Sequence, residues 1–404
     1  EDGTDLFAHF YQNRGFAEIF RFKAGYIPLV ANIVGYCSVR LPTRLIPYGL
    51  TWLPLALSVA AYSIIFSRSY ETWIPSPIVR AAISMLFVLS PLANTNLRAH
   101  TDYSIWSTLF MLILITARPL PCKPLPKALS LVLINVLVWS HPLTIAVIPV
   151  LVVSLFRQHR DRIFYALTVL NLVIHQVVGV ESSGILSGMA SPDVLAGLIQ
   201  PICGTGLVVA KTGFAAAFGM DLLDELNQPL TFLIVVWIAL LGAALVYAYR
   251  QAPRARSPIL FSVYYISVLT FMSILGRGYD TAGLIVGGKR YVHIQGLMFL
   301  LIYGLLAHRL GAWLLHHLRR RRADATSALF KQAVALIPIF LLLCHHLVLG
   351  CNVGDPPSHA IENGLIVRRF FGELAELEQS RGSYEEIYLV AEKKDDWPIV
   401  IDTR

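Results

Sequence analysis

Carboxylates open the chain. Glu1 and Asp2 are adjacent, and Asp5 follows shortly after them. Adjacent carboxylates can raise one another's pKa, which brings one of them into the range that a general base needs near neutral pH. Their oxygens could instead hold a divalent cation. The alternative interpretation is a solvated helix end without a chemical role.

A second polar cluster runs from Asn94 to Asp102, shortly before Trp106. Arg98 and His100 suit an anionic head group, because arginine binds phosphate oxygens through two parallel hydrogen bonds. The alternative is a polar loop next to an aromatic belt at a membrane surface. The residue types therefore indicate either a binding site or an ordinary interfacial loop.

Basic residues end one apolar run and begin the next. Arg277 stands at the first of these places, and Lys289 and Arg290 stand at the second, directly before Tyr291. The preceding pair of glycines has neither the spacing nor the strand and helix context of a nucleotide-binding fingerprint. Phosphate or pyrophosphate binding is one interpretation of these basic residues, and contact with anionic lipid is the other.

Histidines occur at two further places among apolar residues. Ser140-His141-Pro142 interrupts a long apolar run, and proline is common in the first turn of a helix. His345-His346 lies near the end of the last apolar run. We favour a structural interpretation over a functional one for both sites.

These residues stand in a strongly apolar chain. Of its 404 residues, 56% are hydrophobic and only 14% are charged, and the mean hydropathy is +0.62. Soluble domains carry about 25% charged residues. The composition therefore excludes an ordinary soluble enzyme and a disordered chain, and it predicts an integral membrane protein. The five cysteines lack the spacing of a zinc site or a disulfide framework.

Apolar runs of spanning length predict about ten helices and an all-α polytopic fold. The runs are 45–67, 77–95, 103–117, 128–156 (broken near its middle), 163–180, 230–249, 258–275, 291–307 and 332–350. A further apolar segment, 24–40, contains proline and asparagine. It suits an interfacial or re-entrant helix better than a span.

Charges sort the connections between these runs onto two faces. One face carries 17 lysines and arginines against Glu71, Asp161 and Asp324. By the positive-inside rule this face is cytoplasmic. The net charge of +8 is then a consequence of topology, and nucleic-acid binding is not needed to explain it. The external segments on this assignment are 1–44, 90–103, 181–229, 277–290 and 351–404.

The first residue lies on the external face by this assignment, and no signal peptide is present there. We therefore expect a further transmembrane helix to precede residue 1.

The two ends of the chain differ in pattern from the bundle between them. Residues 5–22 alternate aromatic and polar residues at helical spacing, which predicts a juxtamembrane amphipathic helix. In the tail, 359–379 predicts another amphipathic helix, whereas 386–391 and 398–401 predict short strands. The expected divisions are an external loop with interfacial helices (1–44), a transmembrane bundle (45–350) and a small α/β extracytoplasmic segment (351–404).

The order of these features resembles the bacterial GT-C-type glycosyltransferases, which use sugars linked to polyprenyl phosphate. The nearest type modifies O-antigen, another surface glycan or a glycoprotein. The resemblance implies a GT-C-like bundle of about ten or eleven transmembrane helices in the bacterial inner membrane, with the active site facing the periplasm. It rests on Glu1-Asp2-Gly3, Ala24–Ile33, Asn94 and Asn96 before a tryptophan-bearing helix, Ser140-His141-Pro142 and Gly288-Lys289-Arg290-Tyr291.

The resemblance also implies roles for particular residues. The acid that follows the first transmembrane helix is the expected catalytic group, a place that Glu1 and Asp2 occupy. Arg290 and Tyr291 would lie near the donor phosphate. His293 departs from the aromatic and proline residues that often follow in the family, and its role stays open. The remaining expected contacts are Lys289, Arg98 and Arg277 for the donor phosphate, and Asp5, Asn96, His100, Asp102 and His141 for the sugar or the acceptor.

The expected reaction moves a single sugar, with inversion, to a glycan, lipid or protein acceptor on the outer face of the membrane. No residue is assigned as a metal ligand, although Mg²⁺ or Mn²⁺ could share the neutralisation of the phosphate. The alternatives are a flippase or transporter of a lipid-linked glycan and a non-catalytic membrane subunit.

Overall fold

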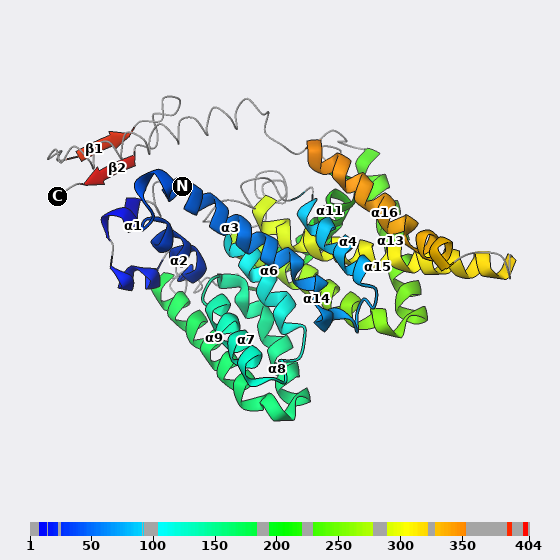
Figure 1. The fold of residues 1–404 in the computed structure, drawn as a ribbon, viewed down its shortest axis with the longest axis horizontal. Helices are drawn as coiled ribbons and strands as arrows, with labels where there is room; N and C mark the ends of the chain where they lie inside the picture. The colour runs from blue at the N-terminus through cyan, green and yellow to red at the C-terminus, as the bar shows by residue number, and fades with distance from the viewer. Residues whose placement is uncertain are drawn as a thin grey trace. The chain divides into compact units, whose positions relative to one another are not determined.

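The computed structural model of the chain describes residues 8–13, 15–22, 26–90, 92, 104–183, 194–219, 229–277, 289–321, 328–352, 386–389 and 399–402, and these are almost entirely helical (Figure 1). The α-helices are α1 (Ala8–Gln12), α2 (Leu29–Ser38), α3 (Ile46–Ser63), α4 (Pro77–Val88), α6 (Ser104–Thr116), α7 (Pro124–Val138), α8 (Ile148–Arg157), α9 (Arg162–Ser183), α11 (Val194–Phe218), α13 (Pro229–Gln251), α14 (Pro253–Arg277), α15 (Lys289–Arg321) and α16 (Ala328–Asn352). The 3₁₀ helices are η2 (Phe16–Phe20), η3 (Thr43–Leu45), η4 (Ile64–Phe66), η5 (Arg68–Tyr70), η6 (Pro142–Val147) and η7 (His159–Asp161). The strands are β1 (Glu386–Leu389) and β2 (Ile399–Asp402).

The chain divides into two compact units that interleave along the sequence. Unit 1 holds α1, η2, α2, η3, α3 as far as Ala61, the elements from α6 to α9, and both strands. Unit 2 holds η4, η5, α4, α11 and the helices from α13 to α16.

Helix α6 forms the centre of unit 1. All of its residues from Ser104 to Thr116 are buried, because an apolar helix without a polar face has no side to offer to water. It packs against α2, α7 and η6. A hydroxyl pair of 2.8 Å between Ser58 and Ser107 joins it to α3. This apolar centre is the surface on which the shorter elements of unit 1 are fixed.

Helices α7, α8 and α9 lie side by side in unit 1 (Figure 1). The outward face of α9 exposes large apolar side chains, including Ile163, Leu167 and Leu170. Exposed apolar surface of this extent belongs in a bilayer rather than in water. Near the start of α7 and α9, Lys127 Nζ and Asp161 Oδ1 form an ion pair of 2.6 Å, on the face that the charge pattern assigns to the cytoplasm.

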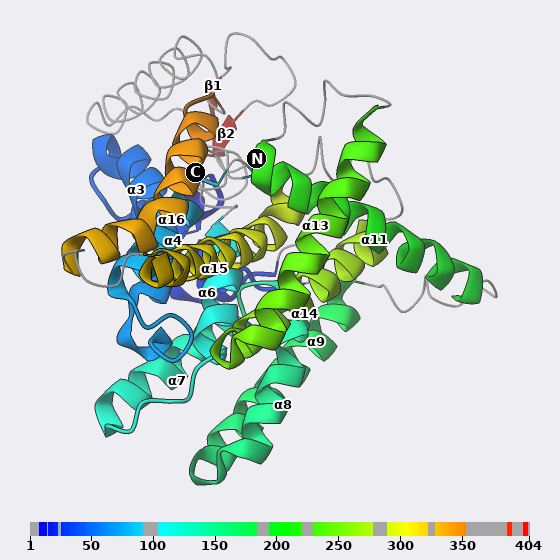
Figure 2. The ribbon, with the colours of Figure 1, turned by 90° about the vertical axis from the view of Figure 1, so that its right-hand side faces the viewer.

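Helix α15 forms the centre of unit 2. It packs against α14, α16, α11 and α4, and its residues from Val292 to Ile302 are buried (Figure 2). Glycine allows two close approaches here. A Cβ on Gly311 would overlap the Ala335 backbone of α16, and one on Gly296 would overlap the Leu92 side chain.

Five described helices are long and apolar enough to span a membrane. They are Thr43–Phe66, His159–Gly179, Phe232–Gln251, Pro253–Leu275 and Tyr291–His317. Shorter apolar helices are Leu29–Ser38, Pro77–Val88, Ser104–Thr116, Pro124–Val138, Pro142–Arg157, Gly204–Phe218 and Ala333–Leu349. The chain is therefore a helical protein with several candidate membrane spans, as its composition predicts.

Helix α11 lies where the sequence pattern suggests only an external segment, 181–229. It packs against α14, α15 and α13, and it buries Val208 and Phe214. Gly213 fits against the rings of Trp237 and Phe299, where a Cβ would overlap both. Its glycines, its proline and Lys211 dilute the apolar run in the sequence, which explains why the helix is missed.

The juxtamembrane segment also differs from the expectation of one amphipathic helix over 5–22. Among its described residues, α1 and η2 are separate short helices. Gly15, which precedes η2, has an extended backbone with φ −66° and ψ 142°, so the helix cannot continue through it. In the tail, β1 and β2 form an antiparallel pair in which Glu386 lies opposite Asp402, at the two places where strands are expected. The expected helix at 359–379 lies outside the described residues.

Candidate functional site

Of the expected site residues, His141 lies in unit 1, at the break between α7 and η6. Helix α7 ends at Val138, and Pro142 starts η6. Proline cannot donate a hydrogen bond to continue α7, but its fixed φ suits the first turn of a new helix. His141 caps this turn: its backbone is extended, and its Nδ1 accepts a hydrogen bond of 3.0 Å from the Leu143 amide.

Hydrogen bonds from three helices, α2, α7 and α9, hold this break in place. Ser140 Oγ donates to the Val136 carbonyl at 2.9 Å and accepts the Val30 amide at 3.3 Å, which ties the break to the first turn of α2. Thr144 Oγ1 donates within the turn to the carbonyl of His141 at 2.9 Å. Gln176 of α9 donates from Nε2 to the Pro142 carbonyl at 3.0 Å. The position of His141 is therefore set by α2, α7 and α9 together.

The imidazole of His141 is only 2% exposed, and aromatic rings surround it. Its centroid lies 4.5 Å from the Trp106 ring and 6.4 Å from the Tyr26 ring. Burial, and secondarily the nearby His175, lower the pKa of His141 to about 3. The side chain is therefore neutral near pH 7.

The hydrogen bond at Nδ1 fixes the tautomer of His141. A backbone N–H can only donate, so Nδ1 must accept and the ring proton must be on Nε2. His141 thus offers a neutral donor, not a base, to any ligand that reaches it.

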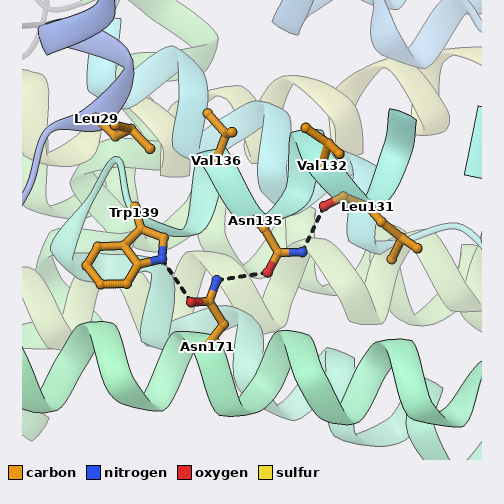
Figure 3. Close-up of a pocket in the computed structure, with 7 residues that line it drawn as sticks. All are labelled: Leu29, Leu131, Val132, Asn135, Val136, Trp139 and Asn171. Atoms are coloured by element: carbon orange, nitrogen blue, oxygen red, sulfur yellow. Dashed lines mark hydrogen bonds between the residues drawn. The ribbon is translucent and has the colours of Figure 1, made fainter. Parts of the chain in front are cut away.

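A polar seam joins α7 to α9 beside this break, as Figure 3 shows. Trp139 Nε1 donates to Asn171 Oδ1 at 2.9 Å, and Asn171 Nδ2 donates to Asn135 Oδ1 at 2.8 Å. Asn135 Nδ2 in turn donates to the Leu131 carbonyl at 2.8 Å. Each side chain in the seam lies four residues from the next on its own helix, which places them on one face.

His175 continues the seam toward the break. It is 1% exposed, and its ring lies 5.0 Å from that of Trp139. Gln176 Nε2 donates to the Pro142 carbonyl, which fixes the orientation of the Gln176 amide. Nε2 of Gln176 therefore also donates to His175 Nδ1, at 3.3 Å. His175 Nε2 is buried and has no hydrogen-bond partner among the described residues.

An apolar groove of about 430 Å³ runs along this part of unit 1 and is open on one side. Its volume is in the range of small-molecule sites, about 300–1,000 Å³. Because the amides of Asn135 and Asn171 bond to each other, the wall of the groove is mainly hydrocarbon (Figure 3). The lining residues are Leu29, Leu131, Val132, Asn135, Val136, Trp139 and Asn171.

Short juxtamembrane helices pack against the start of α2. Ile19 clusters with Ile27 and Leu29, and Asn32 Nδ2 donates to the Ile19 carbonyl at 3.0 Å. With Ile19 turned inward, η2 exposes Phe16 (66%) and Phe20 (53%) on its other side. Exposed phenyl rings on a short helix of this kind are typical of a membrane interface.

Only some of the expected site residues are described. Tyr291 is among them. Its backbone carbonyl accepts a hydrogen bond of 3.4 Å from Ser273 Oγ, so the last turns of α14 lie beside the first turn of α15. Arg277 ends α14, and Lys289 and Arg290 begin α15, which places their backbones at this same end of the helix pair. The remaining expected residues, Glu1, Asp2, Asp5, Asn96, Arg98, His100 and Asp102, lie outside the described residues.

The other histidines singled out in the sequence have structural contacts in unit 2. Nε2 of His345 and Nε2 of His346 approach the carbonyls of Ala217 and Ala216 at 2.7 and 2.9 Å, so they cap the last turn of α11. His293 Nε2 lies 3.0 Å from the Tyr62 hydroxyl, in the buried interior of unit 2. These contacts agree with the structural interpretation of the 345–346 pair.

Asn135, Asn171 and Gln176 are missing from the residues expected at the site. Their signal in the sequence is the spacing of Asn135 from Trp139 and of Asn171 from His175, four residues in each case within apolar runs. Asn135 and Asn171 are 36 residues apart in the chain, and their hydrogen bond follows only from the packing of α7 on α9.

Comparisons of this chain with protein-family models, with curated proteins and with solved structures found no match.

Proposed function

We propose that the chain is a membrane glycosyltransferase that moves one sugar from a polyprenyl-phosphate donor to a glycan, lipid or protein acceptor on the outer face of a bacterial inner membrane. The observation that carries the proposal is the convergence of three separate motifs in unit 1. Tyr26, Trp106 and His141 come from the segments on which the resemblance rests, and their rings lie together. The same unit also holds an apolar groove that suits a lipid chain.

In this mechanism a carboxylate of the protein acts as the general base toward the acceptor. Asp2 or Glu1 removes the proton from the acceptor hydroxyl, whose oxygen then attacks the anomeric carbon from the side opposite the phosphate. The bond between that carbon and the phosphate oxygen breaks, and its electron pair leaves with polyprenyl phosphate. The anomeric configuration is inverted. A positioned general base of this kind contributes about 10²–10⁴-fold to the rate.

Positive charge at the start of α15 supports the assignment of the donor phosphate. A helix N-terminus carries a partial positive charge and favours anions, whereas cations are unfavourable there. Lys289 and Arg290 nevertheless begin α15, and Arg277 ends the adjacent α14. An anion at this end of the helix pair would offset their repulsion and the charge that grows on the leaving phosphate. Mg²⁺ or Mn²⁺ could share that role. In this proposal the bundle has ten or eleven spans.

The test is incubation of the purified chain, in lipid nanodiscs, with polyprenyl-phosphate hexoses and a surface-glycolipid extract. Mass spectrometry should show an acceptor heavier by one sugar, together with free polyprenyl phosphate. Absence of both products with every donor would contradict the proposal.

The seam of Asn135, Asn171 and His175 favours a second candidate, a flippase for a lipid-linked glycan. Polar and ionisable residues within apolar helices are typical of a transport pathway. A flippase would move the donor across a vesicle membrane without consuming it, whereas a transferase would consume it without movement. Reconstituted vesicles with a fluorescent polyprenyl-phosphate sugar distinguish the two.

A further inference from the structure

A tight turn joins α13 to α14 in unit 2 and packs against α15. Helix α13 ends at Gln251, and α14 begins at Pro253. The buried side chains at this turn are small, and Leu306 of α15 packs against them. They are Ala248, Ala252, Ala255 and Ile259. Small residues let helices approach closely, so the end of α13, the start of α14 and the middle of α15 meet here.

Four arginines surround this turn, and we call them the arginine cluster. They are Arg250, Arg254, Arg256 and Arg309. Arg256 Nε donates to the Tyr249 carbonyl at 2.9 Å, so Arg256 reaches back across the turn to α13. Arg309 follows Leu306 by three residues, which places it on the same face of α15. It is half-buried, and Arg254 lies close enough for the two positive charges to repel each other.

No carboxylate balances the arginine cluster in the part of unit 2 that the structure describes around it. The described residues of α11, α13, α14, α15 and α16 include neither aspartate nor glutamate. The ion pairs between described residues are His9–Glu18 and Lys127–Asp161, and both lie in unit 1. Like charges that are close together and partly removed from water raise the free energy of the folded chain. An anion bound between them would offset this cost.

The side chains next to the arginine cluster indicate which kind of anion fits. Each of the three helices exposes a large apolar side chain beside its arginines: Tyr247 on α13, Leu260 on α14 and Leu310 on α15. A soluble anion would neutralise the charges and leave this apolar surface uncovered. An anionic phospholipid suits both features, because its phosphate oxygens match guanidinium groups and its acyl chains cover the apolar side chains. Basic pockets between transmembrane helices bind such head groups.

We propose that an anionic phospholipid of the bilayer binds where α13, α14 and α15 meet, with its phosphate between Arg254 and Arg309. The charge pattern assigns this end of the helices to the cytoplasmic face. Arginines that acted only as a signal for orientation would attract counterions without preferring a lipid at this place. The proposal concerns a bilayer lipid and does not depend on the proposed sugar transfer.

Three double variants separate this site from a general effect of charge. Arg254→Gln with Arg309→Gln removes two charges of the arginine cluster and leaves the buried alanines intact. Arg254→Lys with Arg309→Lys keeps both charges but removes the planar groups that bind two phosphate oxygens at once. The matched control is Arg157→Gln with Arg160→Gln, which removes two exposed arginines of unit 1 and changes the net charge equally.

The experiment titrates the full chain, purified in detergent, with phosphatidylglycerol, phosphatidylcholine or inorganic phosphate. Native mass spectrometry measures the bound ligand, and melting temperatures verify folding. A basic residue near anionic lipid contributes about fivefold to affinity. The double glutamine variant at Arg254 and Arg309 should therefore bind phosphatidylglycerol roughly 25-fold more weakly, with unchanged binding of phosphatidylcholine. The double lysine variant should lose less, and the control should bind as the wild type does.

Unchanged affinity for phosphatidylglycerol in the folded double glutamine variant would overturn the proposal. An equal loss in the control variant would also overturn it, because net charge alone would then attract the lipid. Inorganic phosphate that binds as tightly as phosphatidylglycerol would show a site for a soluble anion instead. Each single glutamine substitution should lose about fivefold, which keeps the test decisive if the double variant does not fold.

Discussion

Polar side chains on α7 and α9 of unit 1 hydrogen-bond to one another. The seam from Trp139 through Asn171 to Asn135 uses one donor or acceptor of each residue on the next. In a bilayer such a bond contributes about 0.6–1.7 kcal/mol, a modest amount because the unfolded chain in the membrane also finds hydrogen-bond partners. The seam therefore fixes α7 against α9, and because its amides bond to each other the wall of the groove is mainly hydrocarbon.

Loss of the seam should destabilise the fold measurably. Asn171→Leu removes the acceptor of Trp139 and the donor to Asn135, and we expect the free energy of unfolding to fall by about 1–2 kcal/mol. The measurement is unfolding in detergent for Asn171→Leu, Asn135→Leu and the double variant. The double variant should lose less than the two single losses added together. Full additivity would contradict a direct bond between the amides.

His141 should make stability depend on pH. Its pKa is about 3 in the folded chain, against 6.5 for an unperturbed histidine. Between these values the unfolded chain binds a proton that the folded chain does not. The contribution of neutral His141 to the free energy of unfolding is therefore complete above about pH 6.5. It falls by about 1.4 kcal/mol per pH unit as the pH decreases below that value.

Melting temperatures between about pH 7.5 and pH 5 test this dependence. The wild type should lose stability more steeply than His141→Asn, which has no imidazole to titrate at this position. Identical slopes in the two proteins would show that His141 is not kept neutral by the fold.

Residue-level prediction from the sequence succeeds where neighbours in the chain determine the environment. The break at Ser140-His141-Pro142 follows from proline alone, and the structure has it. The partners of His141 do not follow in this way, because Tyr26 and Trp106 reach it from distant segments. The proposed roles of Glu1, Asp2 and the cluster from Asn94 to Asp102 stay predictions.

At the scale of elements, we expect η2 to anchor the segment at the membrane interface. Its 3₁₀ turn points Ile19 inward and Phe16 and Phe20 outward. A five-residue helix has little stability of its own, so its packing on α2 and the surrounding lipid must hold it.

Spin labels test this anchor in a cysteine-free background. A label at Phe20→Cys should be relaxed more by oxygen than by a water-soluble nickel complex, because it lies at the lipid interface. Two labels at exposed positions serve as controls. Arg160→Cys represents a label in water, and Leu170→Cys represents a label in the hydrocarbon. If the nickel complex relaxes the Phe20 label as strongly as the Arg160 label, the segment does not lie in the bilayer.

Elements are predictable to the extent that their apolar runs are uniform. Helices α13 and α14 match continuous runs, and α2 has the short length expected of 24–40: its ten residues extend about 15 Å, half of a bilayer. Helix α11 is missed because glycines and Lys211 interrupt its run, although one of the glycines, Gly213, permits close packing. The break between α1 and η2 includes the extended backbone of Gly15.

For the whole molecule, the charge asymmetry predicts the orientation in the membrane. Lys127 and Asp161 lie at the start of α7 and α9, on the face assigned to the cytoplasm, and Cys122 is exposed in the connection just before α7. The orientation is therefore open to a direct chemical test.

A variant that keeps only Cys122 should react with a membrane-impermeant maleimide in inside-out vesicles and not in right-side-out vesicles. The matched control keeps only Thr101→Cys, in a segment that the sequence assigns to the outer face, and should show the opposite pattern. Labelling of Cys122 from the outside would reverse the topology and would remove the outer-face reaction with it.

The most direct test of the proposed transferase is the rate at which the chain releases polyprenyl phosphate from a polyprenyl-phosphate hexose while the sugar appears in a surface-glycolipid acceptor. The wild type should couple the two products one to one. The double variant Glu1→Gln/Asp2→Asn should fold normally and lose about 10²–10⁴-fold in rate, because no carboxylate is left there to accept the acceptor's proton. A wild type without transfer, or a double variant with the full rate, would contradict the account.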